Sequence, residues 1–140
     1  MSSTTPATRD YAEVDFGEEL PEFTPDITMP TVRRFTATTG MTFWRFNDHE
    51  KARASGLPAA IVPGIMSQGI LVAMIHGWAA NADVKRIDTI FRAPLFVDSD
   101  ATCHAVVTDM DDDTKSVEID LTITNEANET RVLGTATVAL

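Results

Sequence analysis

The sequence predicts an α+β domain in which one long apolar helix packs against an antiparallel sheet. From residue 84 to the C-terminus, apolar and polar residues alternate with the period of two that is typical of strands. Before that point, residues 65–78 are apolar around most of a helical circumference, which is typical of a helix buried on nearly all sides. The order of elements, helices first and strands afterwards, also favours this class.

The start of the chain carries weak structural signals. Residues 1–12 are rich in Ser, Thr and Pro without an apolar period, so we expect a disordered arm there and one domain over residues 13–140. Residues 14–28 mix single apolar residues with one glycine and two prolines. This pattern favours a bent strand at the edge of the sheet.

Two short helices are predicted before the long one. Thr28 is the expected N-cap of the first helix, Pro30 stands in its first turn, and Gly40 ends it. The second helix is expected to have Asp48 as its N-cap and to stop at Gly56. Both are short enough to connect the edge strand to the central helix.

The long helix is expected to begin after Pro63-Gly64 and to be the central helix of the domain. Clusters of Asp, Ser, Thr and Asn divide the part of the chain that follows it into segments of strand length. Four antiparallel strands are therefore predicted, over residues 84–97, 101–110, 116–125 and 130–140.

Composition excludes several classes of function. The chain has 11 Lys and Arg residues against 21 Asp and Glu residues, a formal net charge of −10, so neither nucleic acid nor an anionic membrane is an expected partner. Residues 61–80, the longest apolar stretch, contain too many polar residues to span a bilayer. Cys103 is the single cysteine, and neither a metal-ligand cluster nor a dinucleotide loop is present, so no cofactor is expected. Without a leader-like start, we expect a soluble cytoplasmic protein.

Two segments carry a resemblance to a known family. The segments ATTGMTFWRFNDHEKARASGLPAAIVPGIMSQG and FRAPLFVDSDAT resemble the MaoC-like branch of the hot dog fold, the (R)-specific enoyl-thioester hydratases and 3-hydroxyacyl-thioester dehydratases. The resemblance covers residues 14–140 and implies a single hot dog domain, a long central helix wrapped by a curved antiparallel sheet. The family's pattern is matched in frame by Thr39-Gly40, Asp48, Ala52, Gly56 and Val62-Pro63-Gly64.

In the same alignment, the residues that carry out the family's reaction are replaced in this chain. The positions of its catalytic Asp and His are Met41 and Phe46, the supporting Asn and the Pro after it are Phe43 and Trp44, and Pro63 replaces a further His. Neither Met nor Phe can transfer a proton, so the resemblance implies no catalytic residue in this chain. It implies instead a substrate-binding set of Met41, Phe43, Trp44, Phe46, Pro63, Gly64 and Ile65, with backbone N–H groups at Gly64 facing a thioester oxygen. The alternative is that the apolar side chains only plug a vestigial site.

Other polar residues have alternative readings. Asp48 and His49 are the nearest titratable pair to the replaced site and are the fallback catalytic residues of a repurposed enzyme, with Arg45 or Ser67 recruited beside them. Their structural alternative is a helix cap and a solvated residue of the first turn. A group of basic residues that includes Arg92 either holds the phosphates of coenzyme A or belongs to a mixed surface.

Three functions remain open. The first is a subunit without the catalytic pair in a heteromeric hydratase or dehydratase, which shapes the acyl pocket for a second hot dog chain. The second is a homodimeric enzyme repurposed for another reaction on an acyl thioester or a hydrophobic small molecule, and the third is a non-enzymatic ligand-binding hot dog protein. The acyl group is equally open between a fatty acyl chain, a steroid side chain and an aromatic acid, so fatty acid and steroid metabolism both remain possible settings. Its carrier is equally open between coenzyme A and a carrier protein.

Overall fold

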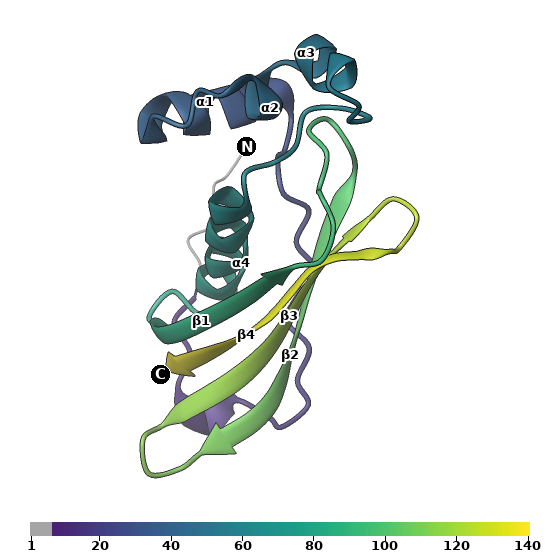
Figure 1. Cartoon of the computed structure of the whole chain (residues 1–140). Helices are drawn as coiled ribbons and strands as arrows, with labels where there is room; N and C mark the ends of the chain where they lie inside the picture. The colour runs from purple at the N-terminus through teal and green to yellow at the C-terminus, as the bar shows by residue number, and fades with distance from the viewer. Residues whose placement is uncertain (1–6) are drawn as a thin grey trace, which may run out of the picture.

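The computed structural model describes residues 7–140 (Figure 1). In these residues one 3-10 helix and four α-helices are combined with one antiparallel sheet. The sheet has the strand order β1-β4-β3-β2, and neighbouring strands are antiparallel, which confirms the predicted class. The elements are a 3-10 helix η1 (Tyr11–Glu13), α1 (Met29–Thr39), α2 (Trp44–Asn47), α3 (His49–Ala54), α4 (Gly64–Trp78), β1 (Asp83–Phe91), β2 (Ala101–Asp111), β3 (Ser116–Asn125) and β4 (Thr130–Ala139).

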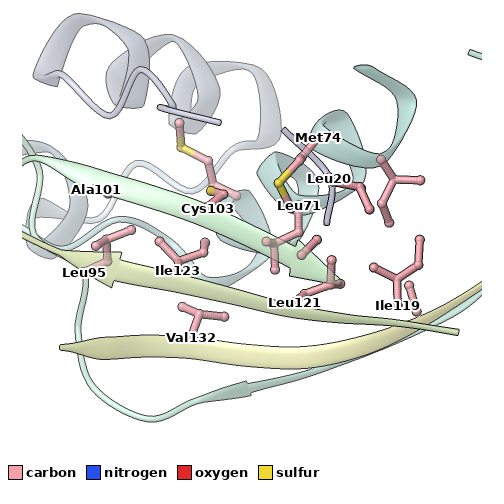
Figure 2. Packing of buried hydrophobic residues seen from close by; sticks show 14 of the residues in the cluster. Leu20, Leu71, Met74, Leu95, Ala101, Cys103, Ile119, Leu121, Ile123 and Val132 are labelled. Carbon is pink, nitrogen blue, oxygen red and sulfur yellow. The ribbon is translucent and has the colours of Figure 1, made fainter. Parts of the chain in front are cut away.

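The core lies between α4 and one face of the sheet. Alternation in β3 buries every second side chain, from Val117 to Ile123, on the face that packs under the helix. Leu71 and Ile75 of α4 have no exposed surface. Figure 2 shows Leu71 and Met74 of the helix above Leu121 of the sheet. The long apolar helix is thus the central helix that the sequence predicted.

Helix α1 begins and ends where the sequence indicates. Pro30 lies in its first turn, and Gly40 ends it in the left-handed conformation with φ 77°. The expected N-cap Thr28 makes no capping hydrogen bond with its side chain. Asp26 organises the turn instead by accepting hydrogen bonds from Thr28 and Thr31, which lower the pKa of its carboxyl to about 2.

Two strand predictions are wrong in part. Residues 14–28 form only isolated bridges to β2, Glu19 with Val106 and Phe23 with Cys103, because the prolines in this segment supply no N–H to a continuous ladder. The first long strand ends at Phe91 rather than at residue 97. Beyond it the chain turns back and residues 95–97 bond to residues 60–62, with Val62 N 2.7 Å from Leu95 O.

One face of α4 is exposed, so the prediction of burial on nearly all sides is wrong for that face. The exposed residues recur every four positions and are Ile65, Gly69, Ala73 and Gly77. Ile65 is 55% exposed. An exposed apolar face of this kind is typical of a surface that packs against a partner.

Part of the expected N-terminal arm lies against the domain. Arg9 donates a hydrogen bond of 2.7 Å to Glu18 and lies 4.9 Å from the ring centre of Trp78. Tyr11 donates a hydrogen bond of 2.6 Å to Asp112, which raises the pKa of the tyrosine to about 12. The disordered arm therefore stays a prediction for residues 1–6, which lie outside the described residues. No helix among residues 7–140 is long and apolar enough to cross a membrane.

Candidate functional site

The segment between α1 and α3 presents an aromatic surface. The rings of Phe43 and Trp44 are 5.0 Å apart, and the guanidinium of Arg45 lies 5.6 Å from the ring centre of Phe43. The backbone holds this segment in place, because Ile61 N donates to Arg45 O and the side chain of Arg33 donates to the carbonyl that ends α2. These hydrogen bonds fix the backbone of the turn that carries the aromatic side chains.

The aromatic surface is open in the single chain. Phe43 is 49% exposed, while Met41, Trp44 and Phe46 are half-buried. Trp44 packs at the margin of the core. Five cavities in residues 7–140 are lined by other side chains. The structure brings Phe43 and Trp44 together on an open surface rather than in an enclosed pocket.

A cavity of about 350 Å³ lies at the start of α4, and we call it the helix-start pocket. Pro63 is the buried N-cap of α4 and offers no capping hydrogen bond from its side chain, so the first backbone N–H groups of the helix have no capping partner. The ring of Phe91 packs against Gly64, where an added Cβ would lie 3.1 Å from the ring. The lining residues are Ile61, Val62, Gly64, Ser67, Phe91, Arg92, Ala93 and Pro94.

Asp48 and His49, the fallback catalytic pair, both make structural contacts. The side chain of Asp48 accepts a hydrogen bond of 3.0 Å from Lys51 N and caps α3, as its structural reading predicts. His49 is not a freely solvated residue. Its Nδ1 accepts from Ala60 N at 3.1 Å, and its Nε2 lies 2.8 Å from Asp98 Oδ2.

Asp98 ties three distant segments together. Because Nδ1 of His49 accepts a hydrogen bond, the ring proton is on Nε2 and is donated to Asp98. Asp98 Oδ1 also accepts from Met29 N at 2.8 Å, at the start of α1. These hydrogen bonds, from His49 first and Met29 second, hold the pKa of Asp98 below its usual 3.8. They also hold Asp98 in the left-handed region, with φ 67°.

Asp98→Ala is expected to lower the free energy of unfolding by about 2 kcal/mol, because it removes both hydrogen bonds and leaves Ala at a positive φ. Asp98→Asn tolerates that φ and keeps one acceptor oxygen, so we expect a loss of about 1 kcal/mol. Urea unfolding followed by circular dichroism measures both. Equal losses in the two variants would contradict this account.

The carboxylate of Asp98 also makes the stability of the fold depend on pH in a predictable direction. Folding lowers the pKa of Asp98, so the ionised carboxylate stabilises the fold. This stabilisation is fully present at a pH above 3.8 and is lost as the pH falls below that value. The difference in stability between the native chain and Asp98→Asn should therefore shrink in acid. A difference that grows as the pH falls would contradict the assignment.

Two further side chains with reactive groups, Cys103 and His76, have structural surroundings. Cys103 is fully buried, and burial raises the pKa of its thiol to about 12. His76 Nε2 lies 3.0 Å from Ala82 O. No group of three or more His, Cys, Asp or Glu side chains in residues 7–140 is placed to hold a metal ion.

Sequence reasoning did not find two features of the site. Asp98 was assigned only to a turn, and no local signal links it to His49, which lies 49 residues away along the chain. Phe91 lies in a strand as predicted, but the sequence does not show that its ring packs against Gly64 at the start of α4. The signal for Phe91 was its position two residues after Thr89, on the side of β1 that faces the helix, where Thr89 accepts from Gln68.

Comparison with known proteins gives one family and one fold. The family model described as "MaoC like domain" matches residues 17–129. An (R)-hydratase from A. caviae involved in PHA biosynthesis superposes with a TM-score of 0.86 at 18% identity, over 91% of this chain and 98% of that one. No curated protein matches the sequence significantly.

Two similar structures are complexes of two chains. The ChsH1-ChsH2 complex from Mycobacterium tuberculosis gives a TM-score of 0.81 at 19% identity, over 90% of this chain and 98% of that one. The C-terminally truncated HadBC (3R-hydroxyacyl-ACP dehydratase) complex from the same organism gives 0.65 at 16% identity, over 90% and 98%. These similarities confirm that the domain is a hot dog fold.

Proposed function

The chain belongs to the MaoC-like hydratase and dehydratase family, and from this we propose that it is the non-catalytic subunit of a heteromeric enzyme acting on acyl thioesters. In this role it shapes the acyl pocket, and a second hot dog chain supplies the acid and base. The acyl group is carried by coenzyme A or by a carrier protein. Its cytoplasmic location stays a prediction.

One observation carries this proposal. Ser67 and Arg92 are the only polar side chains that line the helix-start pocket in the described part of the chain. General acid and base catalysis needs groups that exchange a proton near the working pH and reach the reacting atoms. A serine without a neighbouring base and an arginine do neither. The resemblance in sequence predicts Met41 and Phe46 at the family's catalytic positions, which supports the same reading.

The proposed substrate-binding residues fall into two groups. The first is the aromatic surface over residues 41–46, whose half-exposed side chains suit contact with an acyl chain. The second is the start of α4, where Gly64 presents its N–H and Ile65 presents an exposed apolar side chain. In the proposed complex the partner supplies the wall that is absent from the single chain. The full proposed set is Met41, Phe43, Trp44, Phe46, Pro63, Gly64 and Ile65.

A partner surface is available along β1 and α4. Strand β1 is an edge of the sheet, paired only with β4, so its outer backbone groups are open to another strand. Ile90 is 62% and Phe91 is 52% exposed at its end. Phe91 contacts Gly64, and the open face of α4 begins at Ile65. Strand edge, apolar side chains and helix face thus form one continuous surface, which supports docking of a second hot dog domain.

The first test is a gentle pull-down of the tagged chain from its native host, followed by intact-mass analysis of the complex. We expect a second hot dog chain that carries the Asp and His of the family, in fixed stoichiometry with this one. Hydration of crotonyl-CoA should then require both chains, and this chain alone should show none. Recovery of a homodimer alone would overturn the heteromer, and hydration by this chain alone would overturn its non-catalytic role.

A further inference from the structure

Ser67 is a polar residue whose hydroxyl has no partner within the described chain. Its side chain lies in the second turn of α4 and is 1% exposed. Its Oγ forms no hydrogen bond with any atom of residues 7–140. A buried hydroxyl without a partner destabilises a fold, and alanine fits the same helical position without that penalty. A serine here therefore points to a function outside the fold of the single chain.

The surroundings of Ser67 indicate what it binds. It lines the helix-start pocket together with Gly64, one helical turn before it. The N–H groups at the start of α4 add donors and a positive partial charge to the same end of the pocket. Hydroxyl and amide donors beside one another fit an oxygen acceptor. No carboxylate lines this pocket to compete for them.

The walls of the pocket restrict the acceptor further. Val62, Phe91 and Pro94 give it an apolar lining, which favours an uncharged carbonyl on an apolar chain over a fully ionised carboxylate. The side chain of Arg92 is exposed at the margin, where it is available to an anionic group of the ligand. A carbonyl, an apolar chain and a distant anion together describe an acyl thioester of coenzyme A or of a phosphopantetheine carrier.

We propose that Ser67 is a ligand-binding residue that donates its hydroxyl hydrogen bond to the carbonyl oxygen of an acyl thioester held in the helix-start pocket. The proposal rests on the proposed function and adds a side-chain donor to the backbone donors at Gly64. The ring of Phe91 lies beside Gly64 and forms one wall of this pocket.

The test compares Ser67→Ala with the native chain in the assembly in which the protein purifies. Octanoyl-CoA is the thioester probe, and S-octyl-CoA, a thioether without the carbonyl oxygen, is its matched control. We expect the variant to bind octanoyl-CoA roughly three- to tenfold more weakly by calorimetry, with unchanged affinity for S-octyl-CoA. We also expect its melting temperature to rise by about 2–4 °C, because the unpartnered hydroxyl is removed.

A second variant controls for the loss of a buried hydroxyl. Thr36 is 1% exposed, but its hydroxyl donates to Arg33 O, so Thr36→Val should destabilise the chain and leave both affinities unchanged. An equal loss of affinity for thioester and thioether in Ser67→Ala would overturn the proposal, as would unchanged affinity for octanoyl-CoA. No binding of octanoyl-CoA at millimolar concentration would overturn it too. If the pull-down returns no second hot dog chain, the proposed function is overturned. The affinities of Ser67→Ala for the two probes would still test the role of Ser67.

Discussion

Gly134→Ala is expected to lower the free energy of unfolding by about 3 kcal/mol or more. Gly134 lies in β4, opposite Thr89 of β1 and Leu121 of β3. A Cβ added at this position would overlap the carbonyl oxygen of Asp88 and lie 3.1 Å from the Cα of Thr89. Both obstacles are backbone atoms, so relief requires β1 to move away from β4 as a whole.

Urea unfolding followed by circular dichroism measures this loss, and Gly69→Ala is its matched control. No heavy atom lies within 4 Å of a Cβ built at Gly69, and the residue is exposed on a helix. Alanine there should stabilise the chain by about 1 kcal/mol. Because β1 is also the proposed docking edge, Gly134→Ala should weaken partner binding in parallel. If Gly134→Ala unfolds with a free energy within about 1 kcal/mol of the native chain, β1 can move away from β4 without destabilising the fold, and the prediction is wrong.

The sequence predicts the parts of the fold that are decided by burial or by the conformation of a single residue. In β3, Val117 to Ile123 alternate with charged and hydroxyl residues, and the structure buries the apolar set under α4. Gly40 and Gly56 end their helical segments at positive φ, which glycine adopts readily because it has no Cβ. The sequence is sufficient in these places because the side chain or backbone preference of each residue already determines where it lies.

Prediction failed where a distant segment decides. Whether residues 92–97 extend β1 depends on the competing hydrogen bonds of residues 60–62, which no local pattern reveals. The open face of α4 is as apolar as its buried face, so periodicity could not separate them. Arg9 lies against Trp78 because of a salt bridge with Glu18, although its neighbours in sequence resemble a disordered arm.

In the candidate site, too, the sequence predicts what depends on neighbouring residues and misses what depends on distant ones. The resemblance to the family groups Phe43 and Trp44 at one site, and their rings lie 5.0 Å apart in the structure. The pairing of His49 with Asp98 is a tertiary contact and required the structure. From the sequence, Ser67 is predicted only as a residue that a repurposed enzyme would recruit. Its distinguishing property, a buried hydroxyl without a partner, exists only in three dimensions.

Ile65→Asp is expected to weaken association with the partner chain by about a hundredfold or more while leaving the single chain folded. Ile65 is 55% exposed and lies in the first turn of α4, where a carboxylate is favoured by the helix dipole. The substitution should therefore be neutral or slightly stabilising for the chain alone. In the proposed complex the partner covers this face, and an unpaired carboxylate would lose its hydration there. Association is measured by sedimentation or native mass spectrometry with the partner that the pull-down returns.

Phe16→Asp is the matched control for this prediction. Phe16 is even more exposed, at 73%, and its neighbour Gly17 donates to Val107 O of β2, at the opposite edge of the sheet from β1. Replacing it removes an exposed apolar side chain and adds the same charge, so general effects of hydrophobicity and charge are shared by both variants. Only Ile65→Asp should dissociate the complex, because only Ile65 adjoins the surface formed by β1 and α4. Equal weakening by both would indicate charge repulsion by an acidic partner, and no weakening by Ile65→Asp would place the interface elsewhere.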